Sequence, residues 1–142
     1  MVRYLFTNEV MKRFQKPKNV GDLRSFNGVG TAGDPSCSDV VKLKISFSNG
    51  RIKNARFKVF GCPGAVSATD VFIDLIKGKT IEEALCIKDV DIARALGGLP
   101  VDSMHCTHLP IEAFQKALAN YEHSDVNNSY IKIEELDKEA IQ

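Results

Sequence analysis

A chain of 142 residues that is 44% hydrophobic and 26% charged has the length and composition of one folded domain with a sizeable core. Its formal net charge of +1 gives no electrostatic reason to expect nucleic acid or an anionic membrane as a partner. The sequence contains no apolar run near the roughly 20 residues of a membrane span, and its start lacks the features of signal and transit peptides, so we expect a cytoplasmic location.

The first elements along the chain are a predicted helix and a short strand. Apolar residues at roughly helical spacing predict a helix over residues 3–15, which Pro17 and Gly21 end. Residues 22–39 are rich in Gly, Asp and Ser, and they predict a short strand with a loop.

A β-hairpin is predicted next. Residues 41–48 alternate between apolar and polar side chains, as a half-buried strand does. Asn49-Gly50 follows and is a strong hairpin signal, because a type I′ turn needs a positive φ at both central residues. The return strand runs to Phe60, and a change in its alternation predicts a β-bulge near Lys53-Asn54.

Beyond Phe60 the hydrophobic period changes from that of a strand to that of a helix. Residues 65–76 predict a helix with one apolar face, which Lys77-Gly78 closes. Residues 80–83 form a capping box that opens a short second helix. Asp89 is the expected N-cap of a third helix, which ends at the next pair of glycines.

Thr107 is the expected N-cap of a last amphipathic helix. The chain beyond it becomes polar and acidic, and a short extra element within residues 130–138 is left open. We therefore expect an α+β domain over residues 1–123, followed by a polar C-terminal extension over residues 124–142. The domain should have an N-terminal helix, a small three-stranded antiparallel sheet, and then helices packed on one face.

The chain has four cysteines, Cys37, Cys62, Cys86 and Cys106, and no C-x-x-C pair. In a reducing compartment each is a metal ligand, a reactive thiol or a core residue, rather than half of a disulfide. Cys86 lies in the apolar run A-L-C-I, so we expect it to fill the core. The other three lie in loops or at element junctions with polar, Gly or Pro neighbours, which favours a chemical role.

Cys62 has the clearest physical reason to be a thiolate. Pro63 suits the first position of a helix, which places Cys62 at or near the N-cap. The positive end of the helix dipole stabilises negative charge there. The same argument applies more weakly to Cys106, one residue before the expected N-cap Thr107. The alternative for both thiols is burial in a tight turn.

Three of the cysteines form a mixed ligand set with two further residues, and the set is Cys37, Asp39, Cys62, His105 and Cys106. Thiolate and imidazole are ligands of zinc and of iron–sulfur clusters. The carboxylate of Asp39 is a hard ligand and is poorly suited to permanent retention of a soft cluster. A site that uses it would therefore be built for exchange.

Two catalytic alternatives have weaker support. His105 and Cys106 are adjacent in the sequence, and adjacent side chains tend to diverge in regular structure, so they are weak as a base and nucleophile of a thiol enzyme. Gly28, Gly30 and Gly33 match the order G-x-G-x-x-G of a phosphate loop. A strand follows them, however, rather than the helix of a βαβ unit.

Motifs spread over residues 3–122 resemble those of the IscU/NifU-type iron–sulfur cluster scaffold proteins. K-P-K-N-V-G is similar to that family's N-P-R-N-V-G. G-D-P-S-C-S-D is similar to its G-x-P-x-C-G-D. F-K-V-F-G-C-P-G-A is similar to its F-K-T-F-G-C-G-S-A. The resemblance implies the same α+β fold and a scaffold rather than an enzyme. Such a scaffold assembles a labile [2Fe–2S] cluster from iron and the persulfide sulfur of a cysteine desulfurase, and it passes the cluster to apo iron–sulfur acceptor proteins.

The resemblance also implies roles for individual residues. It makes Cys37, Cys62 and Cys106 the assembly cysteines, with Cys106, on an exposed loop, as the persulfide acceptor. It makes Asp39 the carboxylate of the labile site, and His105 a further ligand candidate for iron. Members of the family bind zinc at this site when iron is absent, so zinc in the cluster-free protein is implied as well.

The segment L-P-V-D-S at residues 99–103 departs from the family pattern. It lacks the second proline and the lysine of L-P-P-V-K, which a dedicated Hsp70-type chaperone reads, so we expect no handoff through that chaperone. His108 is not part of the family pattern and is expected to be a surface or first-turn histidine. The sequence leaves open whether the cluster-bound form is a homodimer, and whether the chain is instead a structural zinc-binding interaction module.

Overall fold

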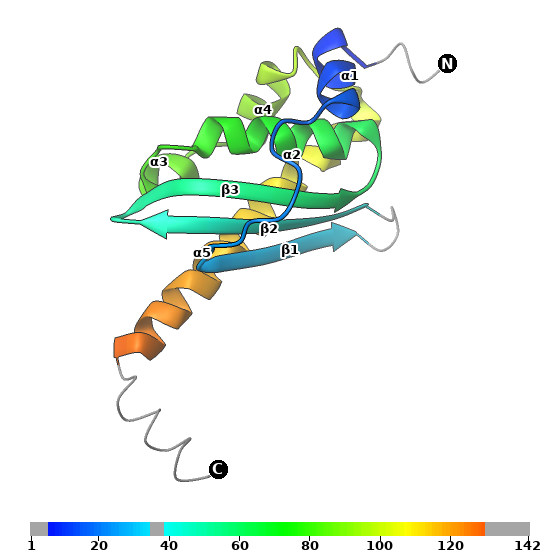
Figure 1. Ribbon diagram of the computed structural model, residues 1–142. Helices are drawn as coiled ribbons and strands as arrows, with labels where there is room; N and C mark the ends of the chain where they lie inside the picture. The colour runs from blue at the N-terminus through cyan, green and yellow to red at the C-terminus, as the bar shows by residue number, and fades with distance from the viewer. Residues whose placement is uncertain (1–5, 35–38, 130–142) are drawn as a thin grey trace.

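The computed structural model describes residues 6–34 and 39–129, and its architecture is the predicted α+β fold (Figure 1). The elements in chain order are α1 (Asn8–Gln15), β1 (Gly28–Asp34), β2 (Asp39–Ser48), β3 (Arg51–Phe60), α2 (Pro63–Ile76), α3 (Ile81–Leu85), α4 (Asp89–Ala95), the 3-10 helix η2 (Val101–Thr107) and α5 (His108–Ser129). An N-terminal helix therefore precedes an antiparallel sheet of order β1-β2-β3, and the other helices follow it.

The hairpin of β2 and β3 forms as its turn residues predict. Asn49 and Gly50 have φ angles of 54° and 73°, the positive values that a type I′ turn needs. Asn54 lies opposite Ser46 and Ile52 lies opposite Phe47, so Lys53 is an extra residue on β3. The predicted β-bulge near Lys53-Asn54 is confirmed.

One face of the sheet forms the core with the helices. Alternate residues of β2 from Val41 to Phe47 are buried, because α2 and α5 pack against that face. Figure 1 shows α5 running behind the sheet and α2 lying alongside β3. The core therefore lies between the sheet and these two helices.

Two glycines of β1 allow α5 to approach the sheet closely. A Cβ atom on Gly28 would lie 2.7 Å from the carbonyl oxygen of Ala117. A Cβ atom on Gly30 would lie 2.5 Å from the backbone nitrogen of Ala117 and would collide with the carbonyl oxygen of Ala113. Two glycines of the G-x-G-x-x-G sequence thus serve helix packing, which agrees with the rejection of a phosphate loop.

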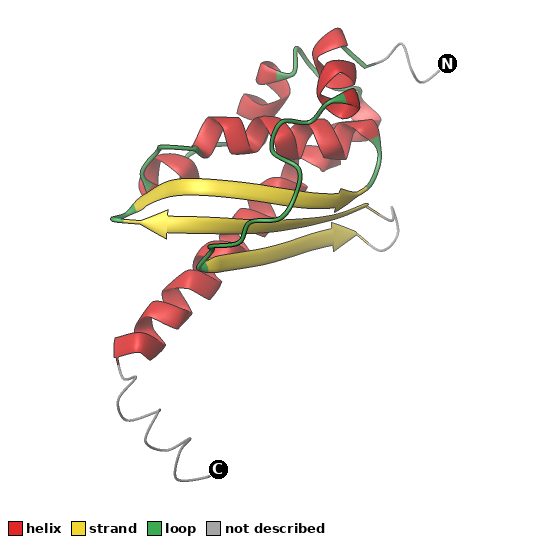
Figure 2. Cartoon of the chain, viewed as in Figure 1, coloured by secondary structure: helices red, strands yellow, loops and turns green. Residues whose placement is uncertain are grey.

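The opposite face of the sheet is crossed by the loop between α1 and β1 (Figure 2). Val20 forms a parallel bridge with Phe57 at the free edge of β3. Asn27 then bonds to Phe47 through both its side-chain amide and its side-chain carbonyl. The loop therefore crosses from the edge strand β3 over β2 to the start of β1, and the helices leave this outer face uncovered.

Helix α1 begins later than predicted and is held by polar contacts. The chain is not helical at Phe6 and Thr7, because the Thr7 hydroxyl accepts a hydrogen bond from the Val10 N–H and caps the helix at Asn8. The Ser67 hydroxyl of α2 donates to the Val10 carbonyl oxygen at 2.6 Å. These bonds fix the position of α1 against α2.

The later helix boundaries confirm one predicted cap and correct two. Thr80 and Glu83 form the predicted capping box of α3. Asp89 is the first residue of α4 rather than its N-cap, because the Asp91 carboxylate accepts the N–H of Lys88 at 2.9 Å. Thr107 closes η2 instead of capping α5, since its hydroxyl donates to the Met104 carbonyl oxygen at 2.7 Å.

The expectation that Cys86 fills the core is wrong, because Cys86 is exposed. It ends the five-residue helix α3, in which Ala84 is the buried residue. Successive residues of a helix point about 100° apart, so the adjacent apolar residues of A-L-C-I cannot all face the core.

Helix α5 continues past the predicted domain boundary at residue 123 as far as Ser129, the last described residue. The division into a domain and an extension stays a prediction, and the element considered within residues 130–138 lies outside the described residues. In the described part of the chain, no helix is both long enough and apolar enough to cross a membrane.

Candidate metal centre

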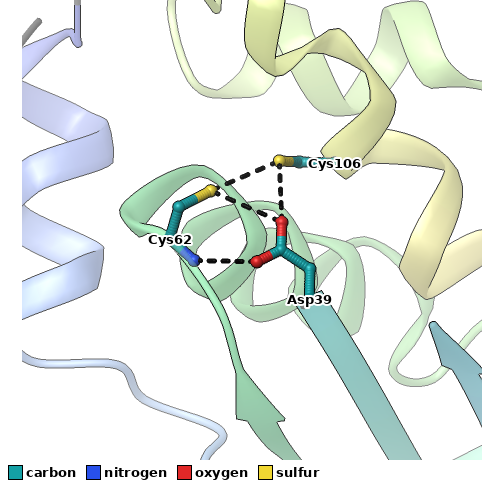
Figure 3. Close-up of side chains that lie close together, drawn as sticks. All are labelled: Asp39, Cys62 and Cys106. Atoms are coloured by element: carbon teal, nitrogen blue, oxygen red, sulfur yellow. Dashed lines mark hydrogen bonds between the residues drawn. The ribbon is translucent and has the colours of Figure 1, made fainter. Parts of the chain in front are cut away.

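Three separate elements bring Asp39, Cys62 and Cys106 together (Figure 3). Asp39 is the first residue of β2, and Cys62 is the N-cap of α2 just after β3 ends. Because β2 and β3 are antiparallel neighbours, the start of one strand lies beside the end of the other. Cys106 comes from η2, which packs against α2.

The ligand atoms of these residues form a tight group. The Sγ atoms of Cys62 and Cys106 lie 3.5 Å apart. They lie 3.8 Å and 4.0 Å from Oδ2 of Asp39, respectively. Asp39 and Cys106 are buried, whereas Cys62 is half-buried. The group is therefore open to the outside at the side of Cys62.

Backbone geometry orients the Asp39 carboxylate. The N–H of Cys62 donates to Oδ1 of Asp39 at 3.2 Å, which leaves Oδ2 facing the two sulfur atoms. A Cβ atom on Gly61 would lie 2.8 Å from the same Oδ1. The glycine before Cys62 thus leaves the space that the carboxylate occupies.

Gly64 leaves space beside both sulfur atoms. A Cβ atom at this position would lie 3.3 Å from Sγ of Cys106 and 3.6 Å from Sγ of Cys62. The sequence analysis gives Gly64 no role of its own. Its role depends on η2 approaching α2, a contact between distant parts of the chain that no local sequence signal reports.

Cys62 is poised as a thiolate. The Cys106 thiol can donate to Cys62 Sγ and lowers the pKa of Cys62 to about 6, assisted by the N–H groups of Ala65 and Gly64 and opposed by burial and by the Asp39 carboxylate. Pro63 is the first residue of α2, as predicted. The predicted N-cap position of Cys62, at the positive end of a helix, is therefore confirmed.

His105 borders the group. Its Nε2 atom lies 3.6 Å from Oδ2 of Asp39 and 3.7 Å from Sγ of Cys106. Its Nδ1 atom lies 3.0 Å from the carbonyl oxygen of Asp102. A carbonyl only accepts hydrogen bonds, so Nδ1 carries a proton, and Nε2 is the ring nitrogen that lies on the side of the site.

Two expectations about this segment are wrong. His105 and Cys106 do not diverge, because the bond to Asp102 turns the ring back toward the sulfur atom. Cys106 is also not on an exposed loop, since it is fully buried within η2. The role of Asp102 depends on the tight turn of η2, which the sequence analysis did not predict.

The remaining predicted residues lie elsewhere. Cys37 lies outside the described residues, so its place relative to the group is a prediction. His108 is the exposed first residue of α5, as expected, and its Nδ1 pairs with the Asp89 carboxylate at 2.9 Å. The structure thus brings together Asp39, Cys62 and Cys106, with His105 at their border.

The donor set fits a transition metal. Two ligands of a tetrahedral ion with metal–sulfur bonds of about 2.3 Å lie roughly 3.8 Å apart, and the two sulfur atoms here are 3.5 Å apart. Two soft thiols and an imidazole suit zinc or iron, whereas the carboxylate is a hard donor that soft metals hold less firmly. The arrangement can therefore bind a metal and also release it.

Comparisons with known proteins agree with this chemistry. The profile of the NifU-like N terminal domain family matches residues 5–128. The chain is 39% identical over 132 residues to the iron-sulfur cluster assembly scaffold protein IscU 1 of Archaeoglobus fulgidus, covering 93% of this chain and 85% of the relative. It is 40% identical over 121 residues to the iron-sulfur cluster assembly enzyme IscU of Drosophila melanogaster, covering 82% and 78%.

Solved structures share the fold. A putative iron-sulfur cluster assembly scaffold protein for the SUF system from Fervidobacterium islandicum superposes with a TM-score of 0.67 at 23% identity, covering 83% of this chain and 99% of that chain. An N-terminal NifU-like protein from Brucella abortus superposes with a TM-score of 0.63 at 14% identity, covering 84% and 95%. By sequence and by fold, this chain belongs to the IscU/NifU scaffold family, whose domain is the NifU-like N terminal domain.

Proposed function

We propose that this protein is a scaffold on which a labile [2Fe–2S] cluster is assembled and from which it is passed to apo iron–sulfur acceptor proteins. The observation that carries the proposal is a hard carboxylate, Asp39, packed against two soft thiols in one group that is open at the side of Cys62. Relatives named as assembly scaffolds cover most of the chain and support the same role. The protein then acts as a carrier rather than as an enzyme.

In this proposal Cys62 and Cys106 bind iron together with Cys37, which stands two residues before Asp39 in the sequence. Asp39 supplies the exchangeable oxygen ligand. His105 is an alternative ligand, because its Nε2 atom lies on the side of the group. Zinc fits the same donors when iron is absent.

Sulfur enters through Cys106. Cys106 first gives up its proton to Cys62 or to solvent; its thiolate then attacks the outer sulfur of a cysteine desulfurase persulfide, the S–S bond breaks, and the desulfurase thiolate leaves. Reduction of the new persulfide to sulfide then takes two electrons from an external reductant. Because Cys106 is fully buried, the transfer requires η2 to move away from α2.

Anaerobic reconstitution tests the proposal. The protein is incubated with iron, cysteine and a cysteine desulfurase, and the visible absorption and circular dichroism of a [2Fe–2S] cluster are followed. We expect the cluster in the wild-type protein and its loss in the Cys37→Ser/Cys62→Ser/Cys106→Ser variant, with Cys86→Ser as the matched control. A cluster that survives the triple substitution would exclude these ligands.

Metal analysis separates the scaffold from a structural zinc module. A scaffold should exchange zinc for iron when iron and sulfide are supplied without oxygen. Stoichiometric zinc that iron and sulfide never displace would instead indicate an interaction module. The cytoplasmic location expected from the sequence stays a prediction.

A further inference from the structure

Cys62 and Cys106 form a dithiol that joins two elements of the fold. Their Sγ atoms lie 3.5 Å apart, although the two residues are 44 positions apart in the sequence. Cys62 is the N-cap of α2, and Cys106 belongs to η2, which packs against α2. A disulfide bond is about 2.0 Å long, so the two sulfur atoms need to approach by only about 1.5 Å to form one.

Solvent reaches the two sulfur atoms unequally. Cys106 is 0% exposed, whereas Cys62 is half-buried and forms the open side of the ligand group. A small oxidant that arrives from solvent therefore meets Cys62 first, and the Cys106 sulfur lies within contact distance of the sulfur that has reacted. An accessible thiol with a second thiol beside it is the arrangement in which cysteines are oxidised to a reversible disulfide.

The surroundings of the two sulfur atoms leave room for them to approach each other. Gly64 has no side chain, and a Cβ atom there would lie 3.3 Å from Sγ of Cys106 and 3.6 Å from Sγ of Cys62. The segment η2 is a 3-10 helix of seven residues, and such short helices are held by poorer hydrogen bonds than α-helices are. A small shift of η2 toward α2 would therefore close the gap between the sulfur atoms.

We propose that Cys62 is a site of oxidation by hydroperoxides and that Cys106 resolves the oxidised sulfur, so that the metal-free site closes as a Cys62–Cys106 disulfide. This inference concerns regulation of the scaffold site, and its regulatory part rests on the proposed function. A transient disulfide with a redox-sensing role is the kind that occurs in reducing compartments. Among the described residues the third cysteine is Cys86, which ends α3 and lies outside the ligand group.

The oxidation takes place in two steps. The Cys62 thiolate attacks one oxygen of hydrogen peroxide, the O–O bond breaks, hydroxide leaves, and Cys62 becomes a sulfenic acid. Cys106 then gives its proton to that hydroxide, and its thiolate attacks the Cys62 sulfur, so that the S–O bond breaks and a second hydroxide leaves. The two sulfur atoms lose two electrons in total, which reduce the peroxide to water and hydroxide. A dithiol reductant restores both thiols by thiol–disulfide exchange.

The disulfide would stop the scaffold in two ways. It removes two soft ligands from the group, because a thiolate is the form of cysteine that binds metal. It also fastens η2 to α2, whereas the proposed sulfur transfer requires η2 to move away from α2. The bond keeps both sulfur atoms in a reversible oxidation state, since the sulfinic and sulfonic acids of cysteine are not reduced by thiols. A metal-free scaffold that meets peroxide thus becomes inactive without being damaged.

Peptide mapping tests the disulfide directly. Reduced, metal-free wild-type protein is treated with hydrogen peroxide, the remaining thiols are blocked with N-ethylmaleimide, and the digest is analysed by mass spectrometry. We expect a cross-link between the peptides that contain Cys62 and Cys106, and its loss after treatment with dithiothreitol. Cys86→Ser is the matched control and should form the same cross-link at the same rate. Zinc-loaded wild-type protein should form it at least about tenfold more slowly, because the metal occupies both sulfur atoms.

Two variants in a Cys37→Ser/Cys86→Ser background separate the roles of the two sulfur atoms. Cys106→Ala lacks the resolving thiol, so peroxide should leave a sulfenic acid on Cys62, which dimedone labels. In Cys62→Ala the buried Cys106 should react with peroxide at least about tenfold more slowly than Cys62 does in the Cys106→Ala variant. Circular dichroism checks that both variants are folded, and the wild-type cross-link tests the inference even if one of them is not.

Zinc uptake measures whether the disulfide closes the site, and zinc is chosen because sulfide would itself reduce the bond. Peroxide-treated and reduced proteins are compared at the lowest zinc concentration that saturates the reduced protein. The treated protein should bind less than about a tenth as much zinc, because two of its thiolate ligands are lost. Dithiothreitol followed by desalting should restore full uptake.

Three results would overturn the inference while leaving the proposed function intact. One is oxidation of Cys62 to a sulfinic acid in the wild-type protein without any cross-link. Another is a cross-link that joins Cys62 to Cys37 rather than to Cys106. The third is full zinc uptake by protein in which the Cys62–Cys106 cross-link has been mapped. Failure of the proposed function appears in a different experiment, when reduced protein takes up no cluster, and it removes the regulatory role while the mapped disulfide still establishes the oxidation site.

Discussion

The thiol pair of Cys62 and Cys106 shows how single residues prepare this site for metal. A hydrogen bond from Cys106 and the N–H groups at the start of α2 favour the charged form of Cys62. Metal binding consumes thiolates, so a low pKa reduces the cost of deprotonation on loading. The Asp39 carboxylate acts in the opposite sense, because its negative charge raises the pKa of the same thiol.

The Cys62 thiolate gives a prediction about pH. A pKa of about 6 means that the thiolate predominates above pH 6, so alkylation of Cys62 by iodoacetamide should be near its plateau rate at pH 7. The rate should fall about tenfold for each pH unit below the pKa. The measurement uses a Cys37→Ser/Cys86→Ser background and mass spectrometry of the peptide that contains Cys62. A midpoint at the roughly 8.5 of an ordinary thiol would contradict this account.

A matched variant checks the cause of the low pKa. Cys106→Ala removes the hydrogen bond that contributes most to the lowering, so the midpoint for Cys62 should move to higher pH. An unchanged midpoint would show that the helix N-terminus alone sets the pKa.

Gly64 offers a steric test of the same site. The side chain of Gly64→Val would occupy the space next to both sulfur atoms, so cluster occupancy should fall by more than about half, because a packed site cannot expand freely. Gly64→Ala should give an intermediate loss. Thermal unfolding of the apo proteins, followed by circular dichroism, measures how much stability each side chain costs in this packed site, and occupancy is compared at a temperature where every variant is folded. Normal occupancy in the valine variant would show that the metal does not enter between Cys62 and Cys106.

Single-residue chemistry was partly predictable from the sequence. Cys62 could be placed at a helix N-cap because the following Pro63 is a local signal. Burial was less predictable, since Cys86 is exposed and Cys106 is buried, contrary to expectation. Which side chain of a short helix is buried depends on which of its faces turns toward the core. Helices α3 and η2 have too few residues for their hydrophobic periodicity to show that face.

Among the elements, η2 controls access to Cys106. It packs against α2, α4 and α5, and the buried hydroxyl of Thr107 bonds to the Met104 carbonyl oxygen within it. The proposed sulfur transfer needs this segment to open, which local unfolding can supply.

Thr107→Val tests the opening of η2. The lost hydrogen bond weakens the segment by about 1 kcal/mol, so the labelling rate of Cys106 by a thiol reagent should rise about fivefold. Thr80→Val is the matched control, because it also removes a hydroxyl bond but lies in the cap of α3. Mass spectrometry reports the labelling of Cys106. If both variants increase the labelling equally, the effect is global destabilisation and η2 is not a separate opening unit.

Elements with a clear hydrophobic period or with characteristic turn residues could be predicted from the sequence. The way in which these elements pack against one another could not. The alternation of β2 and the Asn49-Gly50 turn specified the hairpin, and the change of alternation along β3 specified its bulge. The phosphate loop could be rejected from the sequence, but the actual role of Gly28 and Gly30 could not be found there, because the sequence does not show that α5 packs on β1. The ligand group itself depends on such long-range contacts.

At the scale of the whole molecule, ion pairs between Arg13 of α1 and two aspartates of α2 hold α1 against the rest of the fold. The Arg13 guanidinium bonds to Asp70 and to Asp74 at 2.8 Å each. The Asp70 side chain is fully buried, so loss of Arg13 would remove its ion-pair partner and leave it only the N–H of Asn19.

Arg13→Met should therefore lower the free energy of unfolding of the apo protein by about 3 kcal/mol. Arg94→Met is the control, because Arg94 forms an exposed pair with Asp91 at 3.8 Å, and its loss should cost less than about 0.5 kcal/mol. Guanidinium denaturation under reducing conditions measures both. Equal effects of the two substitutions would show that these ion pairs do not anchor α1.

The charge distribution of the whole molecule could not be read from its net charge of +1. That value predicted no electrostatic partner, yet the register of β2 and β3 places Lys42 beside Lys58 on one open face. The two residues are distant in sequence, and only the strand pairing brings them together.

The most direct test of the central claim is the lifetime of the cluster on Asp39→Ala. Wild-type protein, Asp39→Ala and the exposed-acid control Glu112→Ala are loaded anaerobically with iron and sulfide, and transfer to an apo-ferredoxin is followed by circular dichroism. If Asp39 is the exchangeable ligand, its removal should slow release by about tenfold, equivalent to roughly 1.4 kcal/mol, while Glu112→Ala behaves as the wild type. Faster release from Asp39→Ala would contradict the exchange role on which this account depends.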